Sequence, residues 1–125
     1  MVEQRKLHTA SRFDDLSARK RIELLLNTLA IPTAIPPYFD QLAGPSGPKA
    51  IADCRNSLAH ATATNRKTYA GKSGLELWQT RSLALQYVEL CILRIFGYNG
   101  HYARRGWRGW KGDDEVLVPW VSAVP

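Results

Sequence analysis

The chain has 125 residues, a length that predicts a single domain with a core of moderate size. With 45% hydrophobic and 22% charged residues the composition is typical of a globular protein rather than a disordered one, and no stretch approaches the ~18 consecutive apolar residues of a membrane span. The N-terminus also lacks the apolar core of a signal peptide, so we expect a soluble cytoplasmic protein without membrane contacts.

The formal net charge is +6, and the positive charge is concentrated in one half of the sequence. Residues 49–111 contain eleven Lys and Arg against three acidic residues, which leaves a local surplus of +8. Such a field favours a polyanion as partner, nucleic acid rather than an acidic lipid surface. The alternative is that the basic residues are spread over the surface and only keep the protein soluble.

A first helix is predicted to open at Ser11, with Asp14 three residues later as in a capping box, and to end before Pro32. Its core-facing stripe has the i, i+3, i+4, i+7 spacing and consists of Ile22, Leu25, Leu26 and Leu29. The four prolines and two glycines of residues 32–47 predict an irregular connection after this helix.

A second helix is predicted to begin at Pro48, with Ser46 or Gly47 as its cap, and to fray near residues 62–64. Its predicted apolar face consists of Ile51, Cys54, Leu58 and Ala61. Residues 63–72 then predict a short, basic and polar loop before the next helix.

The third helix is predicted over residues 75–96, because Ser73 and Glu76 form a capping box and Gly97 follows the last turn. Its apolar face is broad enough for burial on more than one side and indicates self-association. It consists of Leu77, Ala84, Leu85, Val88, Cys91, Ile92, Ile95 and Phe96.

The last part of the chain, residues 103–125, is rich in Arg and Trp, then acidic, then strand-like at Val116–Val118. Three helices and no strand expected before residue 115 predict an all-α fold. We therefore expect a small antiparallel helical bundle over residues 1–102, with a short irregular or strand-like C-terminal tail over 103–125 packed on the same domain.

The most informative motif is Arg55-Asn56-Ser57-Leu58-Ala59-His60 on the second helix. Asn56 and His60 are one turn apart on the same helix face, and the long side chain of Arg55 reaches the same space. A cation that stabilises phosphate charge, beside a base that titrates near neutrality, is what RNA cleavage through the ribose 2′-hydroxyl requires. The alternative is that Arg55 pairs with a nearby carboxylate and His60 is a solvated helix residue.

The loop predicted after this motif offers candidate RNA-binding side chains, namely Arg66, Lys67, Tyr69 and Lys72. The basic residues would hold phosphate and Tyr69 would stack on a base, although an ordinary solvated turn has the same composition. No metal site is predicted, because the acidic residues offer no close pair suited to metal binding and the cysteines, Cys54 and Cys91, form no Cys-x-x-Cys motif. A single disulfide between the two cysteines stays open.

With these features the chain resembles the HEPN superfamily over residues 13–102. Arg55, Asn56 and His60 match the Arg-x4-6-His ribonuclease motif of that family, between an amphipathic helix and a long one. The end of the long helix, Leu93-Arg94-Ile95-Phe96-Gly97-Tyr98, is similar to that of the C-terminal HEPN domains of ApeA-type anti-phage proteins.

The resemblance implies a homodimer in which two motif helices form a composite RNA cleft. It implies a metal-independent endoribonuclease without cofactors, acting as a toxin or abortive-infection effector, with an antitoxin or a larger effector chain as a further partner. His60 would be the general acid or base, Arg55 would stabilise the transition state, and Asn56 would orient His60 or the phosphate. The alternatives are a non-catalytic HEPN module that binds nucleotide, RNA or a protein, and a structural interaction domain.

Overall fold

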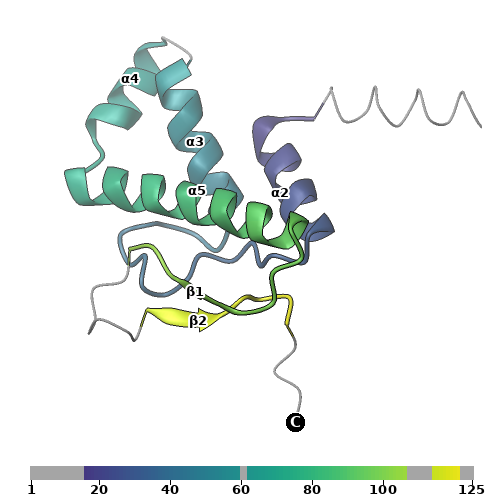
Figure 1. The fold of residues 1–125 in the computed structure, drawn as a ribbon. Helices are drawn as coiled ribbons and strands as arrows, with labels where there is room; N and C mark the ends of the chain where they lie inside the picture. The colour runs from purple at the N-terminus through teal and green to yellow at the C-terminus, as the bar shows by residue number, and fades with distance from the viewer. Residues whose placement is uncertain (1–15, 60–61, 107–113, 122–125) are drawn as a thin grey trace, which may run out of the picture.

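The computed structural model describes residues 16–59, 62–106 and 114–121. Within these ranges the protein is mainly helical, with a small two-stranded sheet (Figure 1). The helices and strands are α2 (Ala18–Thr28), α3 (Gly47–Ala59), α4 (Ala63–Ala70), α5 (Gly74–Ile95), β1 (His101–Ala103) and β2 (Glu115–Leu117).

Helix α5 runs through the middle of the molecule and separates two layers (Figure 1). Helices α2, α3 and α4 lie on one side of it. The connection between α2 and α3 and the two strands lie on the other side. The expected helical bundle is therefore met only in part, because irregular chain and strands cover one side of the long helix.

Three helix starts are set by local capping bonds. Ser17 Oγ accepts from the Lys20 N–H (3.3 Å), so α2 begins at Ala18 rather than at the predicted Ser11, which lies outside the described residues together with Asp14. Ser46 Oγ accepts from the Lys49 N–H (3.2 Å) at the predicted start of α3. Ser73 caps α5 by accepting from the Glu76 N–H (3.1 Å), as the capping box predicts.

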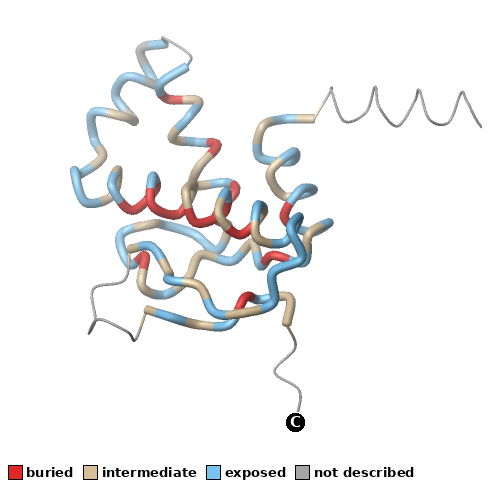
Figure 2. The backbone as a smooth tube through the Cα atoms, in the orientation of Figure 1, coloured by how far each residue is buried: buried red, intermediate tan, exposed pale blue. Residues whose placement is uncertain are grey.

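Residues 63–70, predicted as part of a loop, form α4. The helix continues directly from Thr62, whose carbonyl accepts from the Arg66 N–H (3.0 Å), and ends before Gly71. Its sequence is polar all round, so it lacks the apolar periodicity by which a helix is recognised. None of the α4 side chains that the structure describes is buried, and Figure 2 shows the helix tan and pale blue.

The sheet also differs from expectation. Tyr102 of β1 pairs antiparallel with Val116 of β2, whereas no strand was predicted before residue 115. The predicted strand-like run was placed at 116–118, and the strand itself is Glu115–Leu117, after which Val118 is buried. A three-residue strand carries too little alternation to be recognised, and its partner is more than ten residues away.

The core lies along α5 and joins both layers, as the red stretch in Figure 2 shows. It consists of Leu26, Ile31, Phe39, Leu83, Tyr87 and Leu90. The broad apolar face predicted for α5 is largely open, because Val88, Ile92, Ile95 and Phe96 are all half exposed or more. The buried face instead includes Gln79 and Gln86.

These two glutamines are buried because the irregular connection needs partners for its polar groups. Gln79 Oε1 accepts from the Gln41 N–H (2.8 Å), and its amide donates to Asp40 (2.9 Å). The Gln86 amide donates to the Tyr38 hydroxyl (2.9 Å), and Gln86 Oε1 accepts from the backbone N–H of Arg105 (2.8 Å). Side chains of α5 thus replace the hydrogen bonds that regular structure would supply.

Candidate nucleic-acid interface

Helix α3 buries small residues, whereas Leu58 and Arg55 are exposed. Ala52 and Ser57 are buried, and the Ser57 hydroxyl donates to the Cys54 carbonyl (2.7 Å), which satisfies it inside the helix. Leu58, predicted for the apolar core face, is 61% exposed instead. Arg55 is exposed on this open side.

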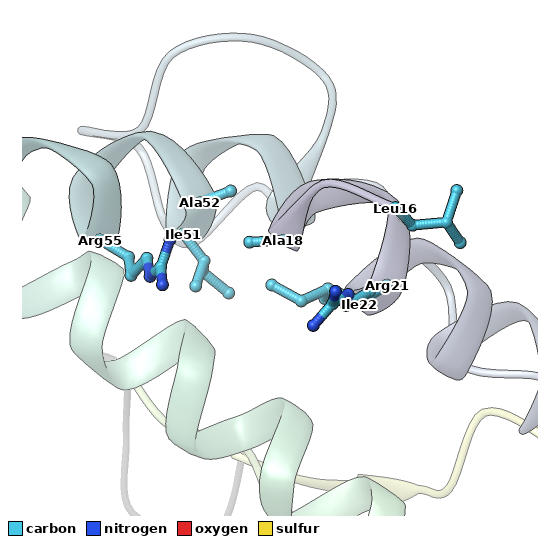
Figure 3. Close-up of a pocket in the computed structure, with 7 residues that line it drawn as sticks. All are labelled: Leu16, Ala18, Arg21, Ile22, Ile51, Ala52 and Arg55. Atoms are coloured by element: carbon cyan, nitrogen blue, oxygen red, sulfur yellow. The ribbon is translucent and has the colours of Figure 1, made fainter. Parts of the chain in front are cut away.

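A groove of about 490 Å³ separates α2 from α3 (Figure 3). Ile51 and Arg55 reach into it from α3, while Ile22 and Arg21 reach into it from α2. The two isoleucines give the groove an apolar wall, and the two arginines give it positive charge. We call this cavity the α2–α3 groove.

A second groove, of about 400 Å³, lies between α3 and α5, and one residue of α4 also lines it. We call it the α3–α5 groove. It is lined by Ile51, Cys54, Arg55, Leu58, Tyr69, Leu77, Thr80, Arg81 and Ala84. Because Ile51 and Arg55 line both cavities, Arg55 stands where the two grooves meet.

The carboxylates of the described helices do not neutralise this site. Each pairs with a base outside the two grooves: Glu23 with Arg19 and Lys20, Asp53 with Lys49, Glu76 with Lys72, and Glu89 with Arg105. The hydrogen bond from Arg19 also lowers the pKa of Glu23. Arg55 and Arg81 therefore face the groove without a carboxylate partner among the residues that the structure describes.

Residues 1–115 match a family described as the YopA C-terminal domain. The chain belongs to this family. No curated protein and no solved structure matches the chain.

This finding overturns the HEPN identification, because the family found over nearly the whole chain is not a HEPN family. The resemblance rested on a six-residue pattern and on the helices around it, and neither feature is specific to one family. The composite cleft and the toxin or abortive-infection role were implied by that resemblance alone.

Of the predicted catalytic residues, two are described and one is not. Arg55 Nη1 donates to the Asn56 side-chain oxygen (3.1 Å), so the guanidinium and the amide lie together on the open side of α3. His60 lies outside the described residues. The structure therefore places the cation and the amide of the motif and leaves the role of the histidine a prediction.

The predicted RNA-binding residues separate into three groups. Tyr69 lines the α3–α5 groove together with Arg55, so these two come together. Arg66 and Lys67 are exposed on α4 and line neither groove. Lys72 pairs with Glu76 (3.8 Å), which makes it part of the start of α5.

Sequence reasoning missed Arg21 and Arg81 of this YopA C-terminal domain. Arg81 follows Leu77 by four residues and precedes Ala84 by three, so helical spacing places it on the same stripe of α5. Arg21 is next to Ile22, at the edge of the predicted core-facing stripe of the first helix. Both signals were available, but nothing in the sequence indicated that α2 and α5 approach the motif on α3.

Membrane spans, metal ligands and the cysteines were also the subject of predictions. No helix in the described ranges is long and apolar enough to cross a membrane, and those ranges hold no cluster of three or more metal-ligating side chains. Cys54 and Cys91 are both free, so the structure does not contain the disulfide that the sequence left open. The homodimer, the antitoxin or larger effector partner, and the cytoplasmic location stay predictions.

Proposed function

We propose that this domain binds RNA, with the α3–α5 groove as the centre of the interface. The observation that carries the proposal is that Arg55 of α3 and Tyr69 of α4 line one open groove. A guanidinium that contacts phosphate and a ring that stacks on a base are the two elements of RNA binding. They come from separate helices and meet only in the fold.

The surrounding charge supports the same proposal. Arg81 lines the groove from the opposite wall, and Arg66 and Lys67 are exposed on the adjoining helix. Lys and Arg side chains near phosphates release bound counterions, so affinity for RNA should fall steeply with salt. The two arginines of the groove come from separate helices, which is the arrangement that a phosphate between them would require.

The test is the binding of a short labelled RNA, followed by fluorescence anisotropy between about 50 and 200 mM salt. We expect Arg55→Gln to weaken binding and to reduce the salt slope by about 0.7, the value for one single-strand phosphate contact. Arg94→Gln is the matched control, because it removes the same charge from another arginine. Arg94 lies in the last turn of α5, over the Trp120 ring (5.6 Å).

Absence of salt-dependent binding by the wild-type domain would contradict the proposal. Equal losses in the Arg55 and Arg94 variants would also contradict it, because the effect would then follow net charge and not the groove. Light scattering in the same samples gives the molecular mass and so tests the predicted homodimer.

Cleavage of the bound RNA through its 2′-hydroxyl is the second candidate function. The hydrogen bond between Arg55 and Asn56 favours it, because a fixed guanidinium can stabilise the charge of a pentacoordinate phosphate. His60 would act as the acid or base. We expect cleavage in EDTA by the wild type, with a cyclic phosphate end, and none by His60→Ala, whereas equal cleavage by both would indicate a contaminant.

A further inference from the structure

The lining of the α3–α5 groove combines apolar and charged side chains, and this combination bears on the form of RNA that fits. Its apolar part includes Ile51, Leu58 and Leu77, with Tyr69 from α4 in the same lining. Arg55 and Arg81 supply its charge. A surface that only held phosphates would need no apolar lining.

The exposure of Leu58 also favours a ligand with an apolar face. This side chain is 61% exposed although it belongs to the groove. Covering apolar surface is favourable in proportion to the area removed from water, so a flat, weakly polar ligand face is the best complement. The faces of nucleobases have this character, and they stack on aromatic side chains.

Base faces are accessible only in unpaired RNA. In an A-form duplex the bases are stacked on one another, and the protein meets phosphates and ribose hydroxyls instead. The groove volume of about 400 Å³ is at the lower end of the range for ligand pockets, which suits one nucleotide and is too small for a duplex.

We propose that the α3–α5 groove is a subsite for one unpaired nucleotide, with the base against Tyr69 and Leu58 and the phosphate between Arg55 and Arg81. This inference rests on the proposed RNA-binding function and adds the strandedness of the RNA. Because Arg55 also lines the α2–α3 groove, the neighbouring nucleotide of the strand would lie on the side of that groove.

The test compares three ligands of one sequence on the wild-type domain: a labelled single strand, the same strand in a duplex, and the single strand with abasic sites. The abasic strand keeps every phosphate and loses only the bases. We expect the single strand to bind at least about fivefold more tightly than either of the others, the lower limit for one stacked base.

Substitution of the ring gives an independent measurement. Tyr69→Ala should lose at least about fivefold in affinity for the single strand and nothing further for the abasic strand. Tyr69→Phe keeps the ring and should bind as the wild type does, and a circular dichroism melt shows whether each variant is folded. Because the abasic comparison uses the unaltered domain, the proposal stays testable even if Tyr69→Ala does not fold.

The outcomes separate the two proposals. If no RNA binds, the proposed function itself fails. If RNA binds but single strand, duplex and abasic strand bind equally, the RNA-binding function stands and the nucleotide subsite is wrong. Loss of affinity for the abasic strand together with an unchanged Tyr69→Ala would place the base at another surface, which also overturns this inference.

Discussion

The two sides of α5 are built on different principles. On the side of the connection and the strands, buried glutamines and core side chains fix an irregular chain through specific hydrogen bonds. On the side of α3 and α4, small residues pack and the larger side chains border two open grooves. The comparison indicates that specific hydrogen bonds order the irregular chain on one side, whereas the other side leaves two grooves open.

The same difference is visible in the tail and in α4. Arg105 pairs with Glu89 of α5, and the Trp120 indole N–H donates to the Tyr98 carbonyl (2.9 Å). At Gly106 the backbone φ of +75° and the Phe39 ring leave no room for a side chain. In α4, by contrast, no described side chain is buried. A segment without buried contacts can be altered with little loss of stability.

The largest loss of stability is expected from a substitution in the core at Leu83, which is fully buried. Leu83→Ala removes packing and leaves a cavity, so we expect a loss of about 2–5 kcal/mol in the free energy of unfolding. Leu58→Ala, the same substitution on the open side, should change it by less than about 0.5 kcal/mol. Urea denaturation measures both. Similar losses in the two variants would remove the distinction between the two sides.

A smaller loss is expected for Gln86→Leu. The substitution keeps the volume but leaves the Arg105 N–H and the Tyr38 hydroxyl without the Gln86 amide. An unsatisfied buried polar group costs about 1–3 kcal/mol, and the tail should loosen at the same time. Hydrogen exchange at the Arg105 amide reports the second effect. An unchanged exchange rate would mean that the tail is held in another way.

Two half-buried or buried tyrosines, Tyr87 and Tyr102, lead us to expect that the protein loses stability at alkaline pH. Burial raises the pKa of Tyr87 to about 12 and that of Tyr102 to about 12. In the unfolded chain a tyrosine ionises near pH 10, so the unfolded state loses its protons first as the pH rises. Stability is therefore complete below about pH 10 and falls between about pH 10 and 12.

Tyr87→Phe tests this alkaline transition, because the side chain keeps its ring and loses the ionisable group. The lost hydrogen bond to the Thr33 carbonyl is long (3.4 Å), so the variant should stay folded at neutral pH. Thermal melts between about pH 8 and 12 should show a weaker decline of the melting temperature than in the wild type. An identical decline would assign the alkaline loss to other groups.

How far the sequence predicted the structure depended on whether the signal was local. The capping bond of Ser73 and the Gly97 stop lie within a few residues of the elements they limit, and α5 was placed within one residue at each end. The burial of Gln86 depends on Tyr38, 48 residues away, and could not be read from the periodicity of α5. That periodicity instead placed Val88 and Ile92 on a broad apolar face, and the fold leaves both residues exposed.

The candidate site follows the same rule. Arg55 and Tyr69 were recognised by residue type, and the structure adds that they border one groove. The helix that carries Tyr69 was predicted as a loop, because α4 is polar all round. The contribution of Arg21 and Arg81 depends on how three helices approach each other, which the sequence of each helix does not specify.

The smallest expected effect on stability is at Arg55, and this variant gives the clearest test of the difference between the two sides of α5. Arg55 is exposed, and its hydrogen bond to Asn56 joins neighbours on one helix, so Arg55→Gln should change the free energy of unfolding by less than about 0.5 kcal/mol. The same variant should show the largest loss in RNA affinity, because this side chain borders both grooves. Urea denaturation and anisotropy on one preparation measure the two quantities together. If the variant lost stability and affinity in parallel, Arg55 would be a structural residue. The side of α5 that faces α3 and α4 would then not differ in role from the side that faces the connection and the strands.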